Sequence, residues 1–277
     1  MPIILTCDVE DWLQASSRSD TVSHRCVDNV QKVVDFLDLL EIKATFFVQG
    51  MVAKQYPEVV RTLHQKAHDI QTHGFSHKQM HRLSRKDLRQ EIVDSKDIIE
   101  QITGQAITGF RAPEFSITKD NFWVFDVLLE SGFCFDSSIF PMRMRRYGIS
   151  RYRLDPHIIK RDAGKIVEFP LCVFRKALIE IPLGGGGYLR LFPFIIFKRL
   201  FDYAGKDGRI CVLYIHPYEF RVDDFKGWES EVPFHTRFFQ SLGRSHIENK
   251  LTQLLKKREC TTMALEADRI LHCKTLP

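Results

Sequence analysis

The sequence lacks the features that mark exported, membrane-spanning and nucleic-acid-binding proteins. Its opening residues, MPIILTCDVE, contain no basic segment, no long apolar run and no small-residue cleavage site, so we predict no signal peptide. The longest apolar stretch, residues 191–201, is too short to cross a bilayer and contains Pro193 and Lys198. No zinc-finger, RNA-binding or basic-zipper pattern is present. We therefore expect neither a transmembrane segment nor a nucleic-acid partner.

The sequence also has no cysteine pair of the C-x-x-C type. Its 7 cysteines are odd in number and scattered along the chain, which is typical of reduced thiols rather than of a disulfide framework. This pattern predicts a cytoplasmic protein. The cysteines are Cys7, Cys26, Cys134, Cys172, Cys211, Cys260 and Cys273.

Positive charge exceeds negative charge only slightly, with a formal net charge of +5. Arginines gather between residues 143 and 153. A mild basic balance can favour an anionic substrate or a membrane surface, but a solvated basic loop is the commoner origin of such a cluster.

Strand-like and helix-like segments alternate along the 277 residues. The length and the 44% hydrophobic content fit a single large α/β domain, and the alternation favours a parallel sheet or barrel covered by helices. We expect a core over about residues 1–216 and a loop-rich extension over about 217–277, with one helix near 247–257 and a short tail. The predicted strands are 3–7, 44–48, 69–72, 107–111, 133–135, 166–169 and 210–215, and further helices are predicted near 30–40, 57–63, 85–104, 122–129 and 194–203.

Polar side chains follow the predicted strands at the points where the strands end. Ligands bind at the carboxyl ends of the strands in parallel α/β proteins, so these side chains are predicted to converge on one rim. They are Asp8, Glu10, Asp11, His73, His77, Arg111, Asp136 and His216.

Two of these residues, His73 and His77, are four apart and can bind one ion from the same face of a turn or helix start. With a carboxylate as third ligand they leave a position open for water, as in catalytic zinc sites. The pair is a weak signal by itself, because the chain has 11 histidines and His81 repeats the spacing. The chemistry also needs two carboxylates, one on the metal and one that takes a proton from the attacking water.

The later strand ends suggest supporting roles, each with a structural alternative. Arg111 can keep a catalytic carboxylate ionised or form an ordinary ion pair. Asp136 can orient a histidine or form an Asx-type turn. His216 can protonate a leaving amine or be a structural histidine.

A glycine run, Gly184–Gly187, lacks the Lys-Ser/Thr ending of a phosphate-binding loop. It predicts a plain loop or a segment that another part of the chain approaches closely. Tyr188 and Arg190, which follow it, are candidate sugar contacts.

Taken in order, these motifs resemble the polysaccharide deacetylase family, also called the NodB homology domain or carbohydrate esterase family 4. The matching strings are TCDVED, HGFSH, RAPE, DSS and LYIH. A closer resemblance is to the branch found in exosortase-associated exopolysaccharide gene clusters, through DVEDW, ATFFVQG, GFRAPEFSIT, FDSSIFP, YGI and GGGGYLRLFP.

The resemblance implies an α/β fold, a distorted and incomplete (β/α) barrel of the NodB-homology type, with one divalent ion, usually zinc. It implies that Asp8 is the general base held by Arg111, and that Asp136 tunes His216, the general acid. The implied metal ligands are His73, His77 and one acid of the first motif.

The first motif departs from the family pattern, in which two aspartates are adjacent. Here Val9 follows Asp8, so the implied third ligand is Glu10, with Asp11 as the alternative. Glu114 stands where the family often has tyrosine, beside the backbone N–H that the resemblance assigns to the substrate oxyanion.

Residues and resemblance together predict a metal-dependent hydrolase that removes an N-acetyl group from an N-acetylhexosamine-containing saccharide in exopolysaccharide biosynthesis. The saccharide can be nucleotide-linked or lipid-linked. Two alternatives remain: a metal-independent amidohydrolase of a small cyclic amide, and a catalytically inactive carbohydrate-binding protein. The oligomeric state is not predicted.

Overall fold

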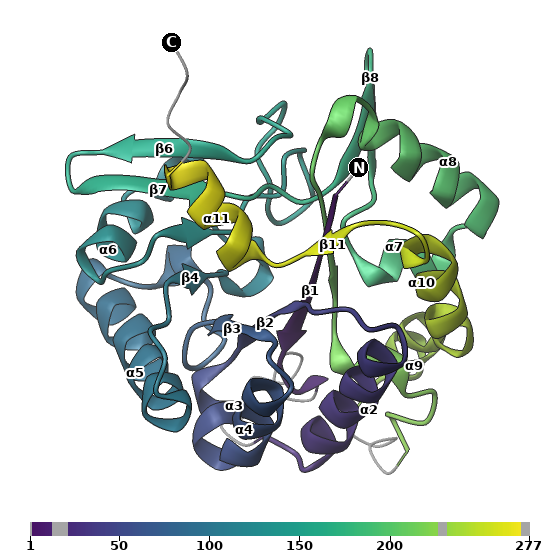
Figure 1. Ribbon diagram of the computed structural model, residues 1–277, viewed down its shortest axis with the longest axis horizontal. Helices are drawn as coiled ribbons and strands as arrows, with labels where there is room; N and C mark the ends of the chain where they lie inside the picture. Colours follow the sequence, from purple (N-terminus) through teal and green to yellow (C-terminus); the bar gives the residue numbers. More distant parts are fainter. Residues whose placement is uncertain (1, 13–21, 227–231, 273–277) are drawn as a thin grey trace.

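A curved sheet forms the centre of the computed structural model, which describes residues 2–12, 22–226 and 232–272 (Figure 1). The strands are β1 (Ile3–Val9), β2 (Thr45–Val48), β3 (Asp69–Thr72), β4 (Gly109–Phe110), β5 (Phe135–Asp136), β6 (His157–Arg161), β7 (Gly164–Glu168), β8 (Val173–Lys176), β9 (Ile179–Pro182), β10 (Cys211–Ile215) and β11 (Cys260–Thr261). The sheet has the order β10-β1-β2-β3-β4-β5-β7-β6, with β11 paired to β1, while β8 and β9 form a separate hairpin. Pairing is parallel except between β6 and β7, so the carboxyl ends of most strands share one edge.

Helices connect and cover the strands, as the alternation predicts. They are α2 (Arg25–Leu39), α3 (Gly50–Gln55), α4 (Pro57–Gln65), α5 (Arg85–Thr103), α6 (Val124–Glu130), α7 (Gly186–Leu191), α8 (Phe194–Ala204), α9 (Phe234–Ser241), α10 (Ile247–Leu255) and α11 (Met263–His272). Local signals set several ends. Ser84 caps α5 by accepting a hydrogen bond from the Asp87 N–H (3.2 Å), and Gly104 ends it at a φ of 69°.

Strand β1 shows how the fold delivers polar groups to the interior. It is buried along its whole length, and successive side chains point to opposite faces. Leu5 and Val9 pack with the main apolar cluster under the helices, whereas Ile4 joins the cluster inside the barrel. Thr6 and Asp8 continue the inner face. This face therefore turns from apolar to polar toward the carboxyl end.

The barrel is incomplete, as predicted, because no continuous ladder joins β7 to β10 in the part of the chain that the structure describes. Isolated bridges link Leu171 to Val212 and Gly185 to Tyr214 instead. The Cys172 N–H donates to the Val212 carbonyl (3.0 Å). Irregular segments thus pair with the edge of β10 that faces away from β1, which makes the barrel distorted.

The prediction of a loop-rich extension with one helix is wrong in part. The chain beyond residue 217 also contains α9, β11 and α11. Helix α11 lies across the barrel (Figure 1, yellow), where the Met263 N–H donates to Thr45 Oγ1 (2.9 Å) and the Ala264 N–H to Asp69 Oδ2 (3.1 Å). These partners lie almost 200 residues away or further, so no local pattern announces them.

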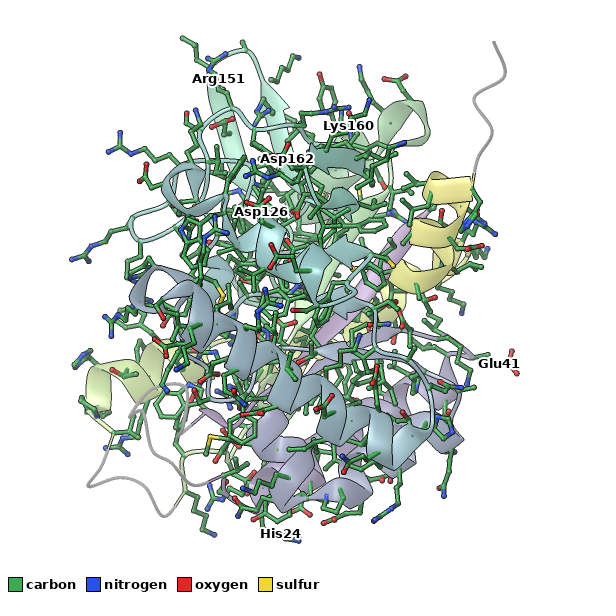
Figure 2. All side chains as sticks on the ribbon, turned by 90° about the vertical axis from the view of Figure 1, so that its left-hand side faces the viewer. His24, Glu41, Asp126, Arg151, Lys160 and Asp162 are labelled. Atoms are coloured by element: carbon green, nitrogen blue, oxygen red, sulfur yellow. The ribbon has the colours of Figure 1, made fainter. Side chains whose placement is uncertain are left out.

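The structure contains two hairpins, β6–β7 and β8–β9, that were not predicted. Of their four strands, only the region of β7 was predicted to be a strand. Arg161, at the β6–β7 turn, donates two hydrogen bonds to Asp126 of α6 (2.7 and 2.8 Å). Figure 2 shows Asp126 close to Asp162 of this turn. Strand β6 is mostly half-buried, so it lacks the apolar run that identifies a core strand.

The absences predicted from the sequence concern membranes and disulfides. Across residues 2–12, 22–226 and 232–272, no helix combines the length and the apolar character needed to cross a bilayer. The described cysteines form no disulfide, and Cys273 lies outside the described residues.

Candidate active site

A buried arginine–aspartate pair lies inside the barrel. Arg111 follows β4, and its side chain has no exposed surface. Its guanidinium donates to Asp8 Oδ1 (2.7 Å), Thr6 Oγ1 (2.6 Å), Ser137 Oγ (2.8 Å) and the Ser137 carbonyl (3.0 Å). It also stacks on Phe47, 4.2 Å from the ring centre. Arg111 therefore gives Asp8 a fixed, positively charged neighbour.

A carboxylate and two imidazoles gather beside this pair. Glu10, His73 and His77 each bring one possible ligand atom within 4.8 Å of the others. Glu10 Oε2 lies 2.5 Å from His77 Nε2 and 3.6 Å from His73 Nε2. His73 Nδ1 lies 2.8 Å from the Arg111 carbonyl. Because that oxygen can only accept, Nδ1 carries the hydrogen and Nε2 offers its lone pair, as in metal-bound histidines.

These residues fit a divalent ion. Two imidazoles, which are neutral when they bind a metal, and one carboxylate are a donor set of catalytic zinc sites, in which a fourth position stays open. Burial by itself would raise the pKa of Glu10, but the charge of His77 and hydrogen bonds from His73 and His77 hold this pKa well below its usual value. Glu10 is thus a carboxylate, the form in which it can bind a metal.

The turn that carries the two histidines is tightly shaped. Gly74 has a φ of 75°, and its N–H donates to Thr72 Oγ1 (3.1 Å). His77 itself has a φ of 57°, an unusual conformation for a non-glycine residue. Ser76 anchors the turn through two hydrogen bonds to Glu91, 2.9 Å from its N–H and 2.5 Å from its hydroxyl. Such conformations persist where the surroundings hold them.

Asp11, the alternative third ligand, lies elsewhere. Its Oδ2 accepts a hydrogen bond from the Ser23 N–H (2.6 Å). Glu10 continues the inward face of Thr6 and Asp8, whereas Asp11 falls on the other side of the extended chain. The structure brings Glu10, rather than Asp11, to the two histidines.

His216 approaches the cluster from the end of β10. Its Nε2 lies 3.5 Å from Glu10 Oε1, and its ring stacks on Tyr218 at 4.8 Å between centres. Glu219 lies on its far side, with Oε2 3.8 Å from His216 Nδ1 and 3.0 Å from the His216 N–H. Glu219 is held in turn by Arg190 Nε (3.0 Å).

Glu219 was not among the predicted site residues, although its position three residues after His216 is a recognisable sign of a helix cap. The two form a capping box at the start of a short 3-10 helix, Pro217–Phe220. Burial by itself would lower the pKa of His216, but the adjacent Glu219 carboxylate and the charge of Glu10 raise it. Glu219 thus favours the protonated imidazole.

Asp136 has a different neighbourhood from the one the resemblance implies. It accepts hydrogen bonds from the Ser138 N–H (2.9 Å) and hydroxyl (2.7 Å), and Ser138 Oγ accepts from the Ala112 N–H (2.8 Å). Asp136 therefore braces the segment after Arg111, while the carboxylate beside His216 is Glu219. Burial raises the pKa of Asp136, and burial with the Asp136 charge raises that of its neighbour Glu168 well above the usual value.

The glycine run is a site of close approach, one of its two predicted forms. A Cβ atom at Gly185 would lie 2.8 Å from the Tyr214 hydroxyl, and one at Gly186 only 2.3 Å from Glu219 Oε2. Helix α7 begins at Gly186. Residues without side chains therefore let α7 pack directly behind Glu219.

A cavity of about 430 Å³ opens over these groups. Glu114 lies on its wall with a φ of 53° and a carboxylate oxygen 3.7 Å from Arg146 Nη1. Tyr188 and Arg190 are not among the described residues that line it, and Arg190 lies buried behind Glu219. The lining residues are Asp8, Glu10, Trp12, His73, His77, Glu114, Phe115, Arg146, Tyr147, Tyr214, His216, Tyr218, Thr236 and Gln240.

Comparison with known proteins agrees with the expected family resemblance. The polysaccharide deacetylase family model matches residues 15–126, and a domain of unknown function, DUF3473, matches residues 137–266. Together these matches confirm the resemblance to polysaccharide deacetylases, whereas the exosortase-associated branch stays a prediction.

Curated relatives match part of the chain. A peptidoglycan-N-acetylglucosamine deacetylase of Bacillus cereus is 29% identical over 89 residues, which are 32% of this chain and 32% of that protein. A peptidoglycan deacetylase of Helicobacter pylori is 27% identical over 178 residues, 61% of this chain and 57% of that one. The matches thus cover less than two thirds of these relatives' own length.

The fold similarity extends over the whole chain. The crystal structure of a Mycobacterium smegmatis protein assigned to the polysaccharide deacetylases has a TM-score of 0.69 at 19% identity. The superposition covers 100% of this chain and 92% of that one. The barrel is therefore of the polysaccharide deacetylase type.

Proposed function

We propose that this chain, which resembles the polysaccharide deacetylases in sequence and fold, is a metal-dependent hydrolase that removes the acetyl group from an N-acetylhexosamine-containing saccharide. The observation that carries the proposal is the meeting of three kinds of group in one cavity: the Glu10–His73–His77 cluster, the Asp8–Arg111 pair and His216. Each supplies a different requirement of amide hydrolysis.

Glu10, His73 and His77 would hold the divalent ion, for which zinc suits the donor set. When bound there, such an ion polarises the acetyl carbonyl and makes water more acidic. Asp8 then takes a proton from the attacking water, since it faces the cavity and Arg111 holds its side chain in place. A backbone N–H near Glu114 would donate to the oxyanion that forms on the carbonyl.

His216 supplies the proton that the departing amine needs. Its Nε2 faces Glu10 and the cavity, while Glu219 lies beside Nδ1 and favours the charged ring. Asp136 and Arg190 act through other residues in this scheme: Asp136 positions the segment that carries Arg111, and Arg190 positions Glu219.

The cavity walls suit a sugar. Aromatic rings offer flat apolar surface to the C–H faces of a pyranose and polar tips to its hydroxyls, and Trp12, Tyr147, Tyr214 and Tyr218 are of this kind. A nucleotide-linked or lipid-linked saccharide in exopolysaccharide biosynthesis is the substrate that we propose.

The test is acetate release from N-acetylhexosamine saccharides by the zinc-loaded protein. Asp8→Asn should keep the metal and lose most turnover, because Asn cannot accept the proton. A His73→Ala/His77→Ala variant should lose metal by elemental analysis, whereas His81→Ala, which repeats the spacing outside the cluster, should retain it. Metal retained by the double variant would contradict the ligand assignment.

The same assay separates the two alternatives. Turnover of a cyclic amide that survives chelation would favour a metal-independent amidohydrolase. A zinc-loaded protein that binds the saccharide without releasing acetate would favour a carbohydrate-binding protein. The Glu10–His73–His77 cluster argues against the first alternative, and the Asp8–Arg111 pair against the second.

A further inference from the structure

We propose that a second, cationic cavity beside the active site binds an anionic group of the saccharide substrate, a phosphate or a carboxylate. The inference rests on the proposed function, because it concerns the substrate of the same site. The second cavity has a volume of about 380 Å³ and shares Arg146 and Tyr147 with the active-site cavity. These two side chains therefore stand at the boundary between two adjoining spaces.

The two cavities differ in the charged side chains that line them. Asp8, Glu10 and Glu114 line the active-site cavity. The second cavity is lined by three cations, Lys119, Arg143 and Arg146, and by one acid, Asp120. An anionic group of the substrate is thus attracted to this second cavity, at one end of the combined space.

The cations are available to a ligand. Within the described chain, no carboxylate lies within ion-pair distance of Lys119 or Arg143, and both side chains are exposed. Arg146 is 72% exposed and only loosely paired, 3.7 Å from Glu114. Arginine and lysine are the usual partners of phosphate and carboxylate groups, with which they form strong charge-assisted hydrogen bonds.

The backbone of the segment that bears the arginines is held by local contacts. Gly148 has a φ of 89°, and a Cβ there would lie 2.0 Å from the Met142 carbonyl oxygen. The Ile149 N–H donates to the Phe140 carbonyl (2.9 Å), and the Met144 N–H to the Tyr147 carbonyl (3.0 Å). A fixed loop loses little freedom when a ligand binds, which favours affinity.

The chain offers a matched control. Arg145 and Arg153 are exposed and close in sequence to Arg143, but they line neither cavity. The variants Lys119→Gln/Arg143→Gln and Arg145→Gln/Arg153→Gln remove the same charge. Only the first pair should affect recognition, if the cavity and not the general positive charge attracts the anion.

The experiment measures acetate release by the full-length, zinc-loaded chain from three disaccharides: a neutral N-acetylglucosamine disaccharide, its 1-phosphate, and an N-acetylglucosamine–glucuronic acid disaccharide. Lys119→Gln/Arg143→Gln should raise KM for the anionic substrate by roughly tenfold or more, since each charge-assisted hydrogen bond accounts for about tenfold in affinity. Its kcat, and both constants for the neutral disaccharide, should stay unchanged. Whether the phosphate or the uronate responds identifies the anion.

Some results would overturn the inference. One is a wild-type protein that treats neutral and anionic disaccharides alike, and another is an equal rise in KM in both paired variants. If no disaccharide is hydrolysed, calorimetric binding of the same compounds decides. If only Lys119→Gln/Arg143→Gln binds an anionic disaccharide more weakly, the second cavity binds the anion although the proposed hydrolysis fails. If the wild type binds none of the compounds, both the anion site and the proposed hydrolysis are refuted.

Discussion

Replacement of Arg111 probes the pair at the centre of the barrel. The Arg111→Met variant removes a side chain that is fully buried and donates four hydrogen bonds, and it leaves Asp8, also buried, without its counter-charge. Loss of one partner of a buried ion pair typically costs ~3–5 kcal/mol in the free energy of unfolding. That is a large part of the ~5–15 kcal/mol that stabilises a folded domain. We therefore expect a strongly destabilised but measurable protein.

Asp8→Asn tests the same pair from the other side, and it leaves the Arg111 charge buried without its partner. The double variant Asp8→Asn/Arg111→Met contains neither buried charge. Its loss of stability should therefore be smaller than the sum of the two single losses, by about 2 kcal/mol or more. Arg111→Lys should cost less than Arg111→Met, because it keeps the charge but not the planar fork that reaches Asp8, Thr6 and Ser137 together.

Urea unfolding of the four proteins, with excess chelator so that metal affinity does not contribute, gives the four free energies. The denaturant dependence should be the same for all variants, which would show that they unfold the same structure. Single losses that add to the double loss within about 0.5 kcal/mol would refute the coupling argued here. Arg111→Lys serves as the second member of the cycle if Arg111→Met does not fold.

Three further outcomes are expected. Glu219→Gln should lower kcat by roughly tenfold or more with little change in KM in steady-state assays, because it weakens the protonated general acid; a matching loss of metal or fold would contradict this role. Gly186→Ala should also lower kcat, because the added Cβ would lie 2.3 Å from Glu219 Oε2 and displace that carboxylate. Gly187→Ala should leave kcat unchanged, because its Cβ would lie 3.9 Å from the nearest neighbouring atom. Glu168 has a raised pKa in the folded state, so its stabilising effect is present at acid pH and is lost as the pH rises above the usual glutamate range. Glu168→Gln should therefore gain stability relative to the wild type between pH 5 and pH 8 in thermal unfolding, and an unchanged difference would mean that the pKa of Glu168 is not raised in the folded state.

Much of the scaffold could be predicted from short stretches of sequence. Strand β3 has the predicted bounds, and α5 begins after Ser84 and ends at Gly104 as its caps indicate. The fold class and the family resemblance are confirmed as well. These features depend on hydrogen bonds and apolar periodicity within one element, which neighbouring residues determine together.

The supporting residues of the candidate site were harder to assign. The motifs drew attention to Asp8, His73 and His216, but Arg190 was expected to contact sugar and instead lies behind Glu219. Thr236 and Gln240 line the cavity from α9, in a region predicted to be loop. Their contribution depends on where α9 packs, which its own eight residues do not specify.

The sequence by itself determined which residue types stand at each strand end, because alternation along a strand and the termination of parallel strands at one edge are local consequences of chain geometry. Only the tertiary structure decided which of these side chains became neighbours across the barrel: Glu10 with His73 and His77, His216 beside them, and Asp8 with Arg111. The physical reason is that such contacts depend on strand order, register and the direction of each side chain, and these follow from packing the whole chain rather than from any single segment.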